Sequence, residues 1–502
     1  MVGIVKTLQR SRAYSGRANR PVVEASVTYR WWWLAAVLGA AGCMGDITPN
    51  CPGCEGSVAC SDNECESSGG AGAECTGTDC DDTGTGGDSG DGGSDGTGGV
   101  GNSGGNLSTN EDVDPEICTG QRPDGNDGAG FFVSAGKIYD PNGCPFVPQG
   151  SNAMAFWNVT VNGNKGTYSD AHLASLGDLA ELGANSVRIT SQIDLDVPEV
   201  RAAFEAWFPT YFAEYFAKYA ADNNLSGAAL ETAREQQRTQ QRQNLEGRFF
   251  GWNTSPTSQR EIIAESADQG LVPILEMHDS TCGNGKPMEQ VHAYWTSTEM
   301  VQLAQDYEDV LWINYANEVD FASPEEWRDY YIDAIQDLRD LGVKNLIVLD
   351  AGKRCGQHPE SILAYGQAVL DADPQHNVVF SWHMYGYWYT LPCSVETLDC
   401  GAGYQFEVSA KFQELADTGL PLFIGEFGWN SAEIQDYPVS YDPTAMLEEA
   451  AKHDIGWSYW MWYEDQPHLQ VVTDLTDPTS LTEAGVYLRD YMQSNTKRAT
   501  IF

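Results

Sequence analysis

Apolar residues gather in eight short runs from about residue 146 onward, and the stretches between these runs repeat apolar residues at helical spacing. The runs are FVPQGSN (146–152), ANSVRIT (184–190), LVPILEMHD (271–279), VLWINYANE (310–318), NLIVLDA (345–351), NVVFSWHMY (377–385), LPLFIGEFG (420–428) and GWSYWMWY (456–463). Nearly continuous apolar runs are typical of parallel strands that are covered on both faces. Intervening stretches such as 170–183 and 324–342 repeat apolar residues every three to four positions and end on glycine.

Eight strand–helix units predict an α/β fold, a (β/α)8 TIM barrel. A doubly wound open sheet is the alternative, and it is disfavoured because no glycine-rich phosphate loop follows the first run.

One connection between the runs is unusually long. About 80 residues separate the second run from the third, which predicts a helical insertion over about 195–255. Its first part places aromatic residues on one helical stripe: Phe204, Trp207, Phe208, Tyr211, Phe212, Tyr215, Phe216 and Tyr219. We expect this stripe to pack on the barrel rim rather than to bind sugar, and the polar second part (230–248) to cover it from solvent.

The first 117 residues have a different composition from the rest. Residues 1–43 are predicted to be a signal peptide, because a basic flank precedes a short apolar run that ends in Ala-Ala-Gly-Cys. That ending resembles a bacterial lipobox, in which Cys43 is lipidated; ordinary cleavage, with Cys43 in a disulfide, is the alternative. Residues 44–80 form a cysteine-rich stalk, and residues 81–117 are a disordered Gly/Asp/Ser-rich linker that leads to a catalytic domain at 118–502.

The cysteines support export. There are 13, so a lipidated Cys43 leaves an even number for pairing. Six lie between residues 51 and 80 and include one C-x-x-C, but no second C-x-x-C or histidine pair follows, so disulfides are favoured over zinc. In the domain we expect bridges Cys118–Cys144, Cys282–Cys355 and Cys393–Cys400, although the sequence alone does not determine the connectivity.

The net charge narrows the class of partner. Asp and Glu number 72 against 28 Lys and Arg, a formal charge of −44. This field repels nucleic acid and anionic lipid, so we expect neither as a partner, and contact with a membrane only through the N-terminal lipid. The localisation expected is extracellular or on the bacterial outer-membrane surface.

Polar residues at the carboxyl ends of the predicted strands are the candidates for chemistry, because functional residues of such barrels lie there. They are Asn152, Arg188, His278, Asn317, Glu318, His383, Tyr385, Glu426 and Trp460. Glu318 and Glu426 lie on the fourth and seventh strands. Two carboxyl groups across a barrel mouth are what cleavage of a glycosidic bond requires.

The motifs NSVRI, EMHDST, NYANE, SWHMYGY and IGEFG, with the Trp-rich last strand, resemble glycoside hydrolase family 5 over about residues 145–465. The resemblance implies that Glu318 is the acid/base and Glu426 the nucleophile of a retaining enzyme, with no metal and no other cofactor. It also implies substrate-binding roles for the remaining strand-end residues. Asn317 would hold the sugar 2-OH, Arg188 and Tyr385 would keep Glu426 ionised, His278 and His383 would line the subsite beside Asn152, and Trp460 would stack beneath the sugar.

Within that family the chain looks most like bacterial endo-β-1,4-mannanases, so we expect a monomer acting on mannan, glucomannan or cellulose. An endo-β-1,4-glucanase is the nearest alternative. A metallohydrolase using His278, Asp279 and His383 lacks H-x-H or H-E-x-x-H spacing. A carbohydrate-binding barrel without catalysis would keep the aromatic residues but would be expected to lose a glutamate.

Overall fold

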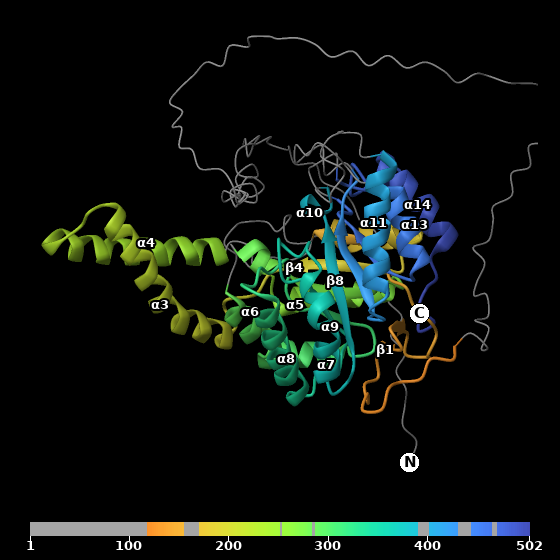
Figure 1. Ribbon diagram of the computed structural model, residues 1–502, viewed down its shortest axis with the longest axis horizontal. Helices are drawn as coiled ribbons and strands as arrows, with labels where there is room; N and C mark the ends of the chain where they lie inside the picture. Colours follow the sequence, from red (N-terminus) through yellow and green to blue (C-terminus); the bar gives the residue numbers. More distant parts are fainter. Residues whose placement is uncertain are drawn as a thin grey trace, which may run out of the picture. The chain divides into compact units, whose positions relative to one another are not determined.

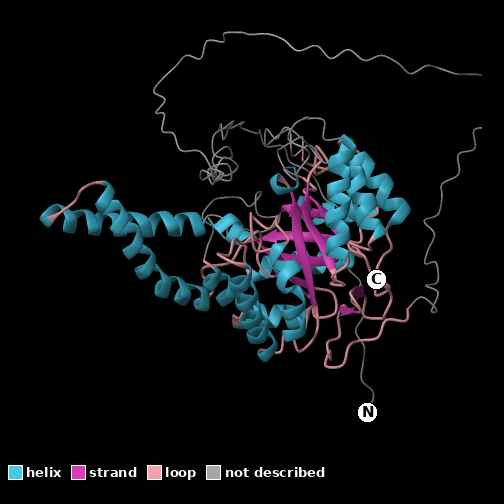
Figure 2. Cartoon of the chain, in the orientation of Figure 1, coloured by secondary structure: helices cyan, strands magenta, loops and turns pink. Residues whose placement is uncertain are grey.

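Eight parallel strands close into a barrel in a computed structural model of the chain. The structure describes residues 118–154, 170–250, 254–283, 287–389, 401–429, 443–463 and 469–502, all within the compact unit Asn110–Phe502. The strand order around the barrel is β10-β3-β4-β5-β6-β7-β8-β9. The predicted (β/α)8 fold is therefore confirmed, and helices surround the strands in Figure 2.

Each predicted apolar run overlaps one barrel strand. The strands are β3 (Gln149–Met154), β4 (Ser186–Ser191), β5 (Val272–Met277), β6 (Trp312–Asn314), β7 (Ile347–Asp350), β8 (Val378–Met384), β9 (Leu422–Phe427) and β10 (Gly456–Tyr459). The seven strands from β4 to β10 have their burial described throughout, and every residue in them is buried, as expected for strands covered on both faces.

Helices follow the strands and cover the outside of the barrel. They are α2 (Asp170–Glu181), α5 (Pro256–Asp268), α6 (Met288–Trp295), α7 (Thr298–Asp306), α8 (Pro324–Asp340), α9 (Glu360–Ala372), α11 (Gly401–Ala416), α13 (Pro443–Lys452) and α14 (Glu483–Asn495), with two short helices, η1 (His278–Gly283) and α10 (Gly386–Tyr389). Local sequence sets where several of them begin. The side chains of Ser255, Ser297 and Ser323 each accept a backbone N–H from the first turn of the helix that follows.

A small hairpin that the sequence did not predict lies at the amino ends of the strands. It consists of β1 (Phe132–Ser134) and β2 (Lys137–Tyr139), joined by a turn in which Ala135 and Gly136 have φ of 49° and 74°. Phe131 packs edge-on against Trp312, the first residue of β6, with ring centroids 5.5 Å apart. The hairpin therefore helps to close the apolar core at the end of the barrel opposite the candidate site.

The helical insertion after the second barrel strand is present and forms a hairpin of α3 (Pro198–Asp222) and α4 (Gly227–Phe250), which leaves the barrel beside α6 in Figure 1. Its aromatic stripe divides into two rows. Phe204, Phe208, Phe212 and Phe216 are buried, whereas Trp207, Tyr211, Tyr215 and Tyr219 are half-buried. The guanidinium of Arg242 on α4 lies 5.7 Å and 5.5 Å from the ring centroids of Phe204 and Phe208.

The expected packing of this stripe therefore needs a correction. Only the start of α3 lies against the barrel, where Glu199 accepts hydrogen bonds from Thr298 at the start of α7. Farther along, α4 covers the phenylalanine row, and the guanidinium groups of its arginines Arg234 and Arg242 lie over phenylalanine rings of α3. The prediction that the polar second part covers the first is confirmed.

No helix among the described residues is long and apolar enough to cross a membrane. The predicted signal peptide, stalk and linker, together with Cys43, lie outside the described residues, as does the expected Cys393–Cys400 bridge.

Candidate active site

The strand ends bring the predicted polar residues to one end of the barrel. Asn152 on β3 is in register with Arg188 on β4, and His383 on β8 is in register with Glu426 on β9, next to an irregularity at Trp382. His278, Asn317, Glu318, Tyr385 and Trp460 follow within a few residues of the ends of their strands.

Arg188 is the fully buried centre of this group. Its Nη1 donates to Glu426 Oε1 and to the side-chain oxygen of Asn152, each at 2.8 Å. Its Nη2 donates to Asn317 Oδ1 at 2.8 Å, and its Nε donates to Asn314 Oδ1 at 2.7 Å. Every nitrogen of the guanidinium has a partner, so the buried charge is held in one position.

Asn152 and Asn317 support Arg188 from two sides. Both are 0% exposed. Asn152 Nδ2 donates to backbone carbonyls, including Gly425 O at 3.0 Å, and Asn317 Nδ2 donates to Thr281 Oγ1 at 2.9 Å. Asn152 was expected to bind substrate, but both ends of its amide are bonded within the protein, which fits a supporting role for Arg188.

Glu426 lies between a cation and a hydroxyl group. Besides the bond from Arg188, Tyr385 donates its hydroxyl to Glu426 Oε2 at 3.2 Å. His383 Nδ1 lies 3.5 Å from the same oxygen. These contacts hold the carboxyl group of Glu426 in one position.

Glu318 has a different environment from Glu426. Burial raises the pKa of Glu318, and the charge of Glu426 adds to this effect, while His383 acts in the opposite direction. His383 Nδ1 lies 2.8 Å from Glu318 Oε1. Glu318 also has a φ of 47°, in the left-handed region that residues other than glycine seldom adopt.

A second carboxylate holds the other side of His383. Asp350 Oδ2, at the end of β7, lies 3.4 Å from His383 Nε2. Burial alone would lower the pKa of His383, but the carboxylates of Glu426 and Asp350 outweigh it and raise the pKa to about 10. For Asp350, burial would raise the pKa, but His383 and Arg188 hold it well below its usual range.

His278 and Trp460 form one wall of the site. Their rings stack with centroids 5.7 Å apart and an interplanar angle of 21°. His278 Nδ1 lies 2.5 Å from Glu276 Oε1, and although burial alone would lower the pKa of His278, this carboxylate raises it.

Glu276 and Asp350 are two site residues that the sequence analysis missed. Both are 0% exposed, and they lie 3.6 Å and 3.7 Å from Arg188 Nη2. A signal for each was present, since Glu276 is a charged residue inside an apolar run and Asp350 is the last residue of a predicted strand.

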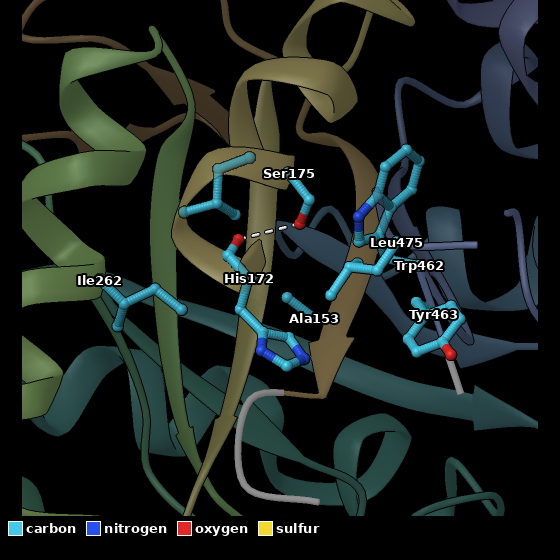
Figure 3. A pocket seen from close by; sticks show the side chains of 8 residues that line it. Ala153, His172, Ser175, Ile262, Trp462, Tyr463 and Leu475 are labelled. Carbon is cyan, nitrogen blue, oxygen red and sulfur yellow. Dashed lines mark hydrogen bonds between the residues drawn. The ribbon is translucent and has the colours of Figure 1, made fainter. Parts of the chain in front are cut away.

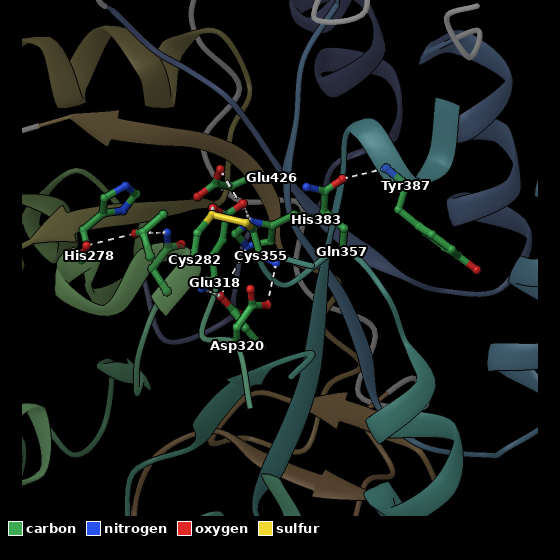
Figure 4. Close-up of a disulfide and its surroundings, with 12 residues drawn as sticks. His278, Cys282, Glu318, Asp320, Cys355, Gln357, His383, Tyr387 and Glu426 are labelled. Atoms are coloured by element: carbon green, nitrogen blue, oxygen red, sulfur yellow. Dashed lines mark hydrogen bonds and ion pairs between the residues drawn. A yellow bond between two sulfur atoms is a disulfide. The ribbon is translucent and has the colours of Figure 1, made fainter. Parts of the chain in front are cut away.

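A cysteine bridge borders Glu318 (Figure 4). Cys282 in η1 is joined to Cys355 in the loop after β7, and Cys282 Sγ lies 3.8 Å from Glu318 Oε2. The backbone N–H of Cys282 also donates to the carbonyl of Glu318 at 2.8 Å. Cys118 is joined to Cys144, as the sequence suggested.

Among the described residues, side chains of the types that can bind a metal ion cluster in this site. Glu318, His383 and Glu426 each offer one atom within 4.8 Å of the others, as do Glu276, His278 and Glu426. Their carboxyl groups already pair with Arg188 and the two histidines.

A small apolar pocket elsewhere in the barrel is drawn in Figure 3. It is lined by Ala153, His172, Ile262, Trp462 and Tyr463 among others, and its volume is about 10 Å³. That volume suits a single water molecule at most, so this pocket is not a substrate site.

Comparisons with known proteins agree with this arrangement. The family model described as Cellulase (glycosyl hydrolase family 5) matches residues 252–466, which include Glu318 and Glu426. The mannan endo-1,4-beta-mannosidase of Salipaludibacillus agaradhaerens is 27% identical, covering 74% of this chain and 96% of that protein. Residues 252–466 therefore match glycosyl hydrolase family 5, and this region holds both glutamates.

Further relatives are also mannan-degrading enzymes by name. The mannan endo-1,4-beta-mannosidase of Cellvibrio japonicus is 24% identical, covering 74% of this chain and 70% of that protein. The catalytic domain of mannanase from Streptomyces sp. SirexAA-E is 25% identical over 75% of this chain and 96% of that domain, with a TM-score of 0.54. The chain is therefore a glycoside hydrolase, and the metallohydrolase and non-catalytic alternatives are set aside.

Proposed function

We propose that this family 5 glycoside hydrolase is a retaining endo-β-1,4-mannanase. The observation that carries the stereochemical part is the separation of two carboxyl groups. One oxygen of Glu318 lies within 4.8 Å of one oxygen of Glu426. Retaining glycosidases hold their carboxyl groups about 5–5.5 Å apart, whereas inverting enzymes leave roughly 6.5–9.5 Å for a water molecule.

The charges around the two glutamates support different roles for them. Arg188 and the two histidines, His278 and His383, face the four carboxyl groups of Glu276, Glu318, Asp350 and Glu426. The carboxyl groups outnumber the basic groups, so a proton on one carboxyl group reduces the excess negative charge. Glu318 is the one whose pKa burial raises, so it is proposed as the acid and Glu426 as the nucleophile.

The reaction follows from these roles. Glu426 attacks the anomeric carbon while the glycosidic bond breaks, and the proton of Glu318 moves to the departing oxygen. Glu318, now a carboxylate, then takes a proton from a water molecule. The oxygen of that water attacks the same carbon and releases Glu426.

Mannan is the proposed substrate because of the relatives. Proteins named mannan endo-1,4-beta-mannosidase match over 74% of this chain at 27% and 24% identity. A glucanase remains the second candidate, since the Beta-mannanase/endoglucanase A of Caldicellulosiruptor saccharolyticus is 30% identical over 250 residues. The chain is proposed to act as a monomer on the neutral polysaccharide.

Two measurements on the full chain test this function. Reducing-sugar release is compared on mannan, glucomannan and carboxymethylcellulose, and mannan is expected to be cleaved fastest. Proton NMR then identifies the anomer that appears first from mannan, and a β-anomer is expected. An initial α-anomer would mean inversion, and faster cleavage of carboxymethylcellulose would favour the glucanase.

The enzyme is further proposed to be a surface lipoprotein anchored at Cys43. Support comes from the Ala-Ala-Gly-Cys ending of an apolar run and from the even number of cysteines that remains. Replacing Cys43 by Ser should move the protein from the membrane fraction to the soluble fraction, while Cys51→Ser should not. Unchanged fractionation of the Cys43 variant would contradict the anchor.

A further inference from the structure

The carboxylate of Asp350 is fully buried in the site, yet double displacement assigns it no step. Its Oδ1 accepts from Asn314 Nδ2 at 3.3 Å, and its Oδ2 lies 3.7 Å from Arg188 Nη2. Burying a charge costs several kcal/mol unless its contacts compensate for it. A buried carboxylate at this position is therefore expected to act through its contacts with neighbouring residues.

Asp350 makes its first contact with the backbone of Glu318. Its Oδ2 accepts the N–H of Glu318 at 3.1 Å. Glu318 has a φ of 47°, and a non-glycine residue keeps such a conformation only where the surrounding contacts hold it. This hydrogen bond is one of those contacts, so it helps to fix the backbone of Glu318 and thereby the position of its side chain.

A second contact reaches the carboxyl group of Glu318 through a histidine. His383 Nε2 lies 3.4 Å from Asp350 Oδ2, and its Nδ1 lies 2.8 Å from Glu318 Oε1. His383 Nε2 makes no hydrogen bond within the described residues, so its contact with Asp350 is an ion pair. A charged ring suits the carboxyl groups on both of its sides, and the carboxylates of Glu426 and Asp350 both favour this charge.

We propose that Asp350 is the positioning residue of the general acid: it fixes the backbone of Glu318 and orients a charged His383 against the Glu318 carboxyl group. The inference rests on the acid/base role proposed above for Glu318. Asp350 acts through these two residues and has no proposed contact with the sugar.

Other charged and titratable groups also face this pair. They are Arg188 from β4, Glu276 and His278 at β5, Tyr385 after β8 and Glu426 from β9. These groups stay in place when only Asp350 is changed. Removing one negative charge lowers the proton affinity of every neighbour, so Glu318 should then lose its proton at a lower pH.

The test compares Asp350→Asn with the full-length parent enzyme. Asparagine keeps an oxygen for the Glu318 N–H and removes the charge. We expect kcat/KM on mannan to fall about tenfold to a hundredfold, and its alkaline limb to move to lower pH. On an activated dinitrophenyl β-mannoside the fall should be less than about threefold, because that leaving group needs no proton.

Asp373→Asn provides a matched control. Asp373 is also a buried carboxylate, and it pairs with Arg339 through two bonds of 2.9 Å away from the site. Both variants should lower the melting temperature. Only Asp350→Asn should change the pH profile and the dependence on the leaving group.

A third measurement needs no variant. In the intact enzyme labelled with 15N-histidine, NMR should show both ring nitrogens of His383 protonated at pH 7. A neutral ring would overturn the proposal, and so would an Asp350→Asn profile equal to that of Asp373→Asn. A parent enzyme that releases no sugar from mannan, glucomannan or carboxymethylcellulose would instead refute the proposed function.

Discussion

Glu318 and Glu426 carry the same side chain, yet their neighbours give them opposite chemistry. Glu426 receives hydrogen bonds from Arg188 and Tyr385. Among the described residues, Glu318 pairs with no arginine; it faces His383 and a cysteine sulfur, and burial raises its pKa. The difference comes from the strands that carry the neighbours and not from the glutamates.

Substitution of either glutamate should separate these roles. With Glu318→Gln, kcat/KM on mannan should fall about 10²–10⁴-fold, while an activated aryl mannoside should still enter the first step. With Glu426→Ala, both substrates should be inert, and azide should restore turnover with inverted product. Steady-state kinetics and NMR of the product measure these outcomes.

An exposed glutamate gives the control for this pair. Glu325→Gln, in the first turn of α8, removes an exposed carboxylate whose hydrogen bond comes from Tyr365 and not from a site residue, and it should leave both rates unchanged. Equal losses on mannan and on the aryl mannoside in Glu318→Gln would contradict its role as the acid.

The sequence could predict the site residues that end strands and carry a recognisable chemistry. Glu318, Glu426, Arg188 and the two histidines were found in this way. It could not predict that Asn152 would be buried with both ends of its amide bonded to the protein, because that depends on the register between β3 and β4. The sequence did not indicate Asp350, because its role depends on two contacts with residues that follow or lie on other strands.

At the scale of elements, the α3–α4 hairpin shows where helical periodicity is ambiguous. The stripe correctly indicated a buried apolar face. The pattern did not indicate the partner of that face, because α4 is polar nearly throughout and covers the phenylalanines with arginine guanidinium groups. Pairing between two helices of one insertion is a tertiary property that neither helix encodes alone.

Phe212→Ala tests whether this hairpin is stabilised separately from the barrel. Phe212 is 7% exposed on α3, and Phe→Ala in a core costs about 3–5 kcal/mol. Hydrogen exchange should accelerate in α3 and α4 while the barrel strands keep their protection and the aryl mannoside is cleaved at the parent rate. The exposed Glu214→Ala serves as the control, and equal loss of protection in the barrel would show that the two form one cooperative unit.

For the whole molecule, the excess of acidic residues and the buried cluster of charged residues both make the folded state less stable as the pH rises. His383 has a folded pKa of about 10 against an ordinary 6.5, so its contribution is complete below about pH 6.5 and is lost as the pH rises to 10. Glu318, with a raised pKa, has the same sign. The low pKa values of Asp350 and Asp373 add stability above about pH 4 that is lost in stronger acid.

The melting temperature should therefore be highest between about pH 4.5 and 6.5 and fall by several degrees toward pH 9. Repulsion from the net charge of −44 contributes to that fall at low salt. At about 0.5 M salt the surface part is screened, and the part due to the buried cluster should remain. A melting temperature that is constant from pH 6 to 9 at high salt would contradict this account.

The barrel itself could be predicted almost completely, because each strand is an apolar run bounded by turn residues. The hairpin of β1 and β2 was missed for a physical reason. Each strand has three residues, too few for a periodic signal, and the hairpin gains its stability by packing Phe131 and Val133 against the barrel core.

Closure of the barrel also constrains the order in which a newly made chain can become an enzyme. The ring closes where β10 pairs with β3, and Ser151 Oγ donates to the carbonyl of Tyr459, 308 residues away. Until β10 is synthesised, β3 and β9 each have an unpaired edge at which two chains can associate. Contacts between residues this distant in sequence also form slowly. The residue after β10 is Trp460, so the strand that removes the last open edges also delivers the aromatic wall of the site. Protection from aggregation and the capacity to bind substrate should therefore be acquired in the same event.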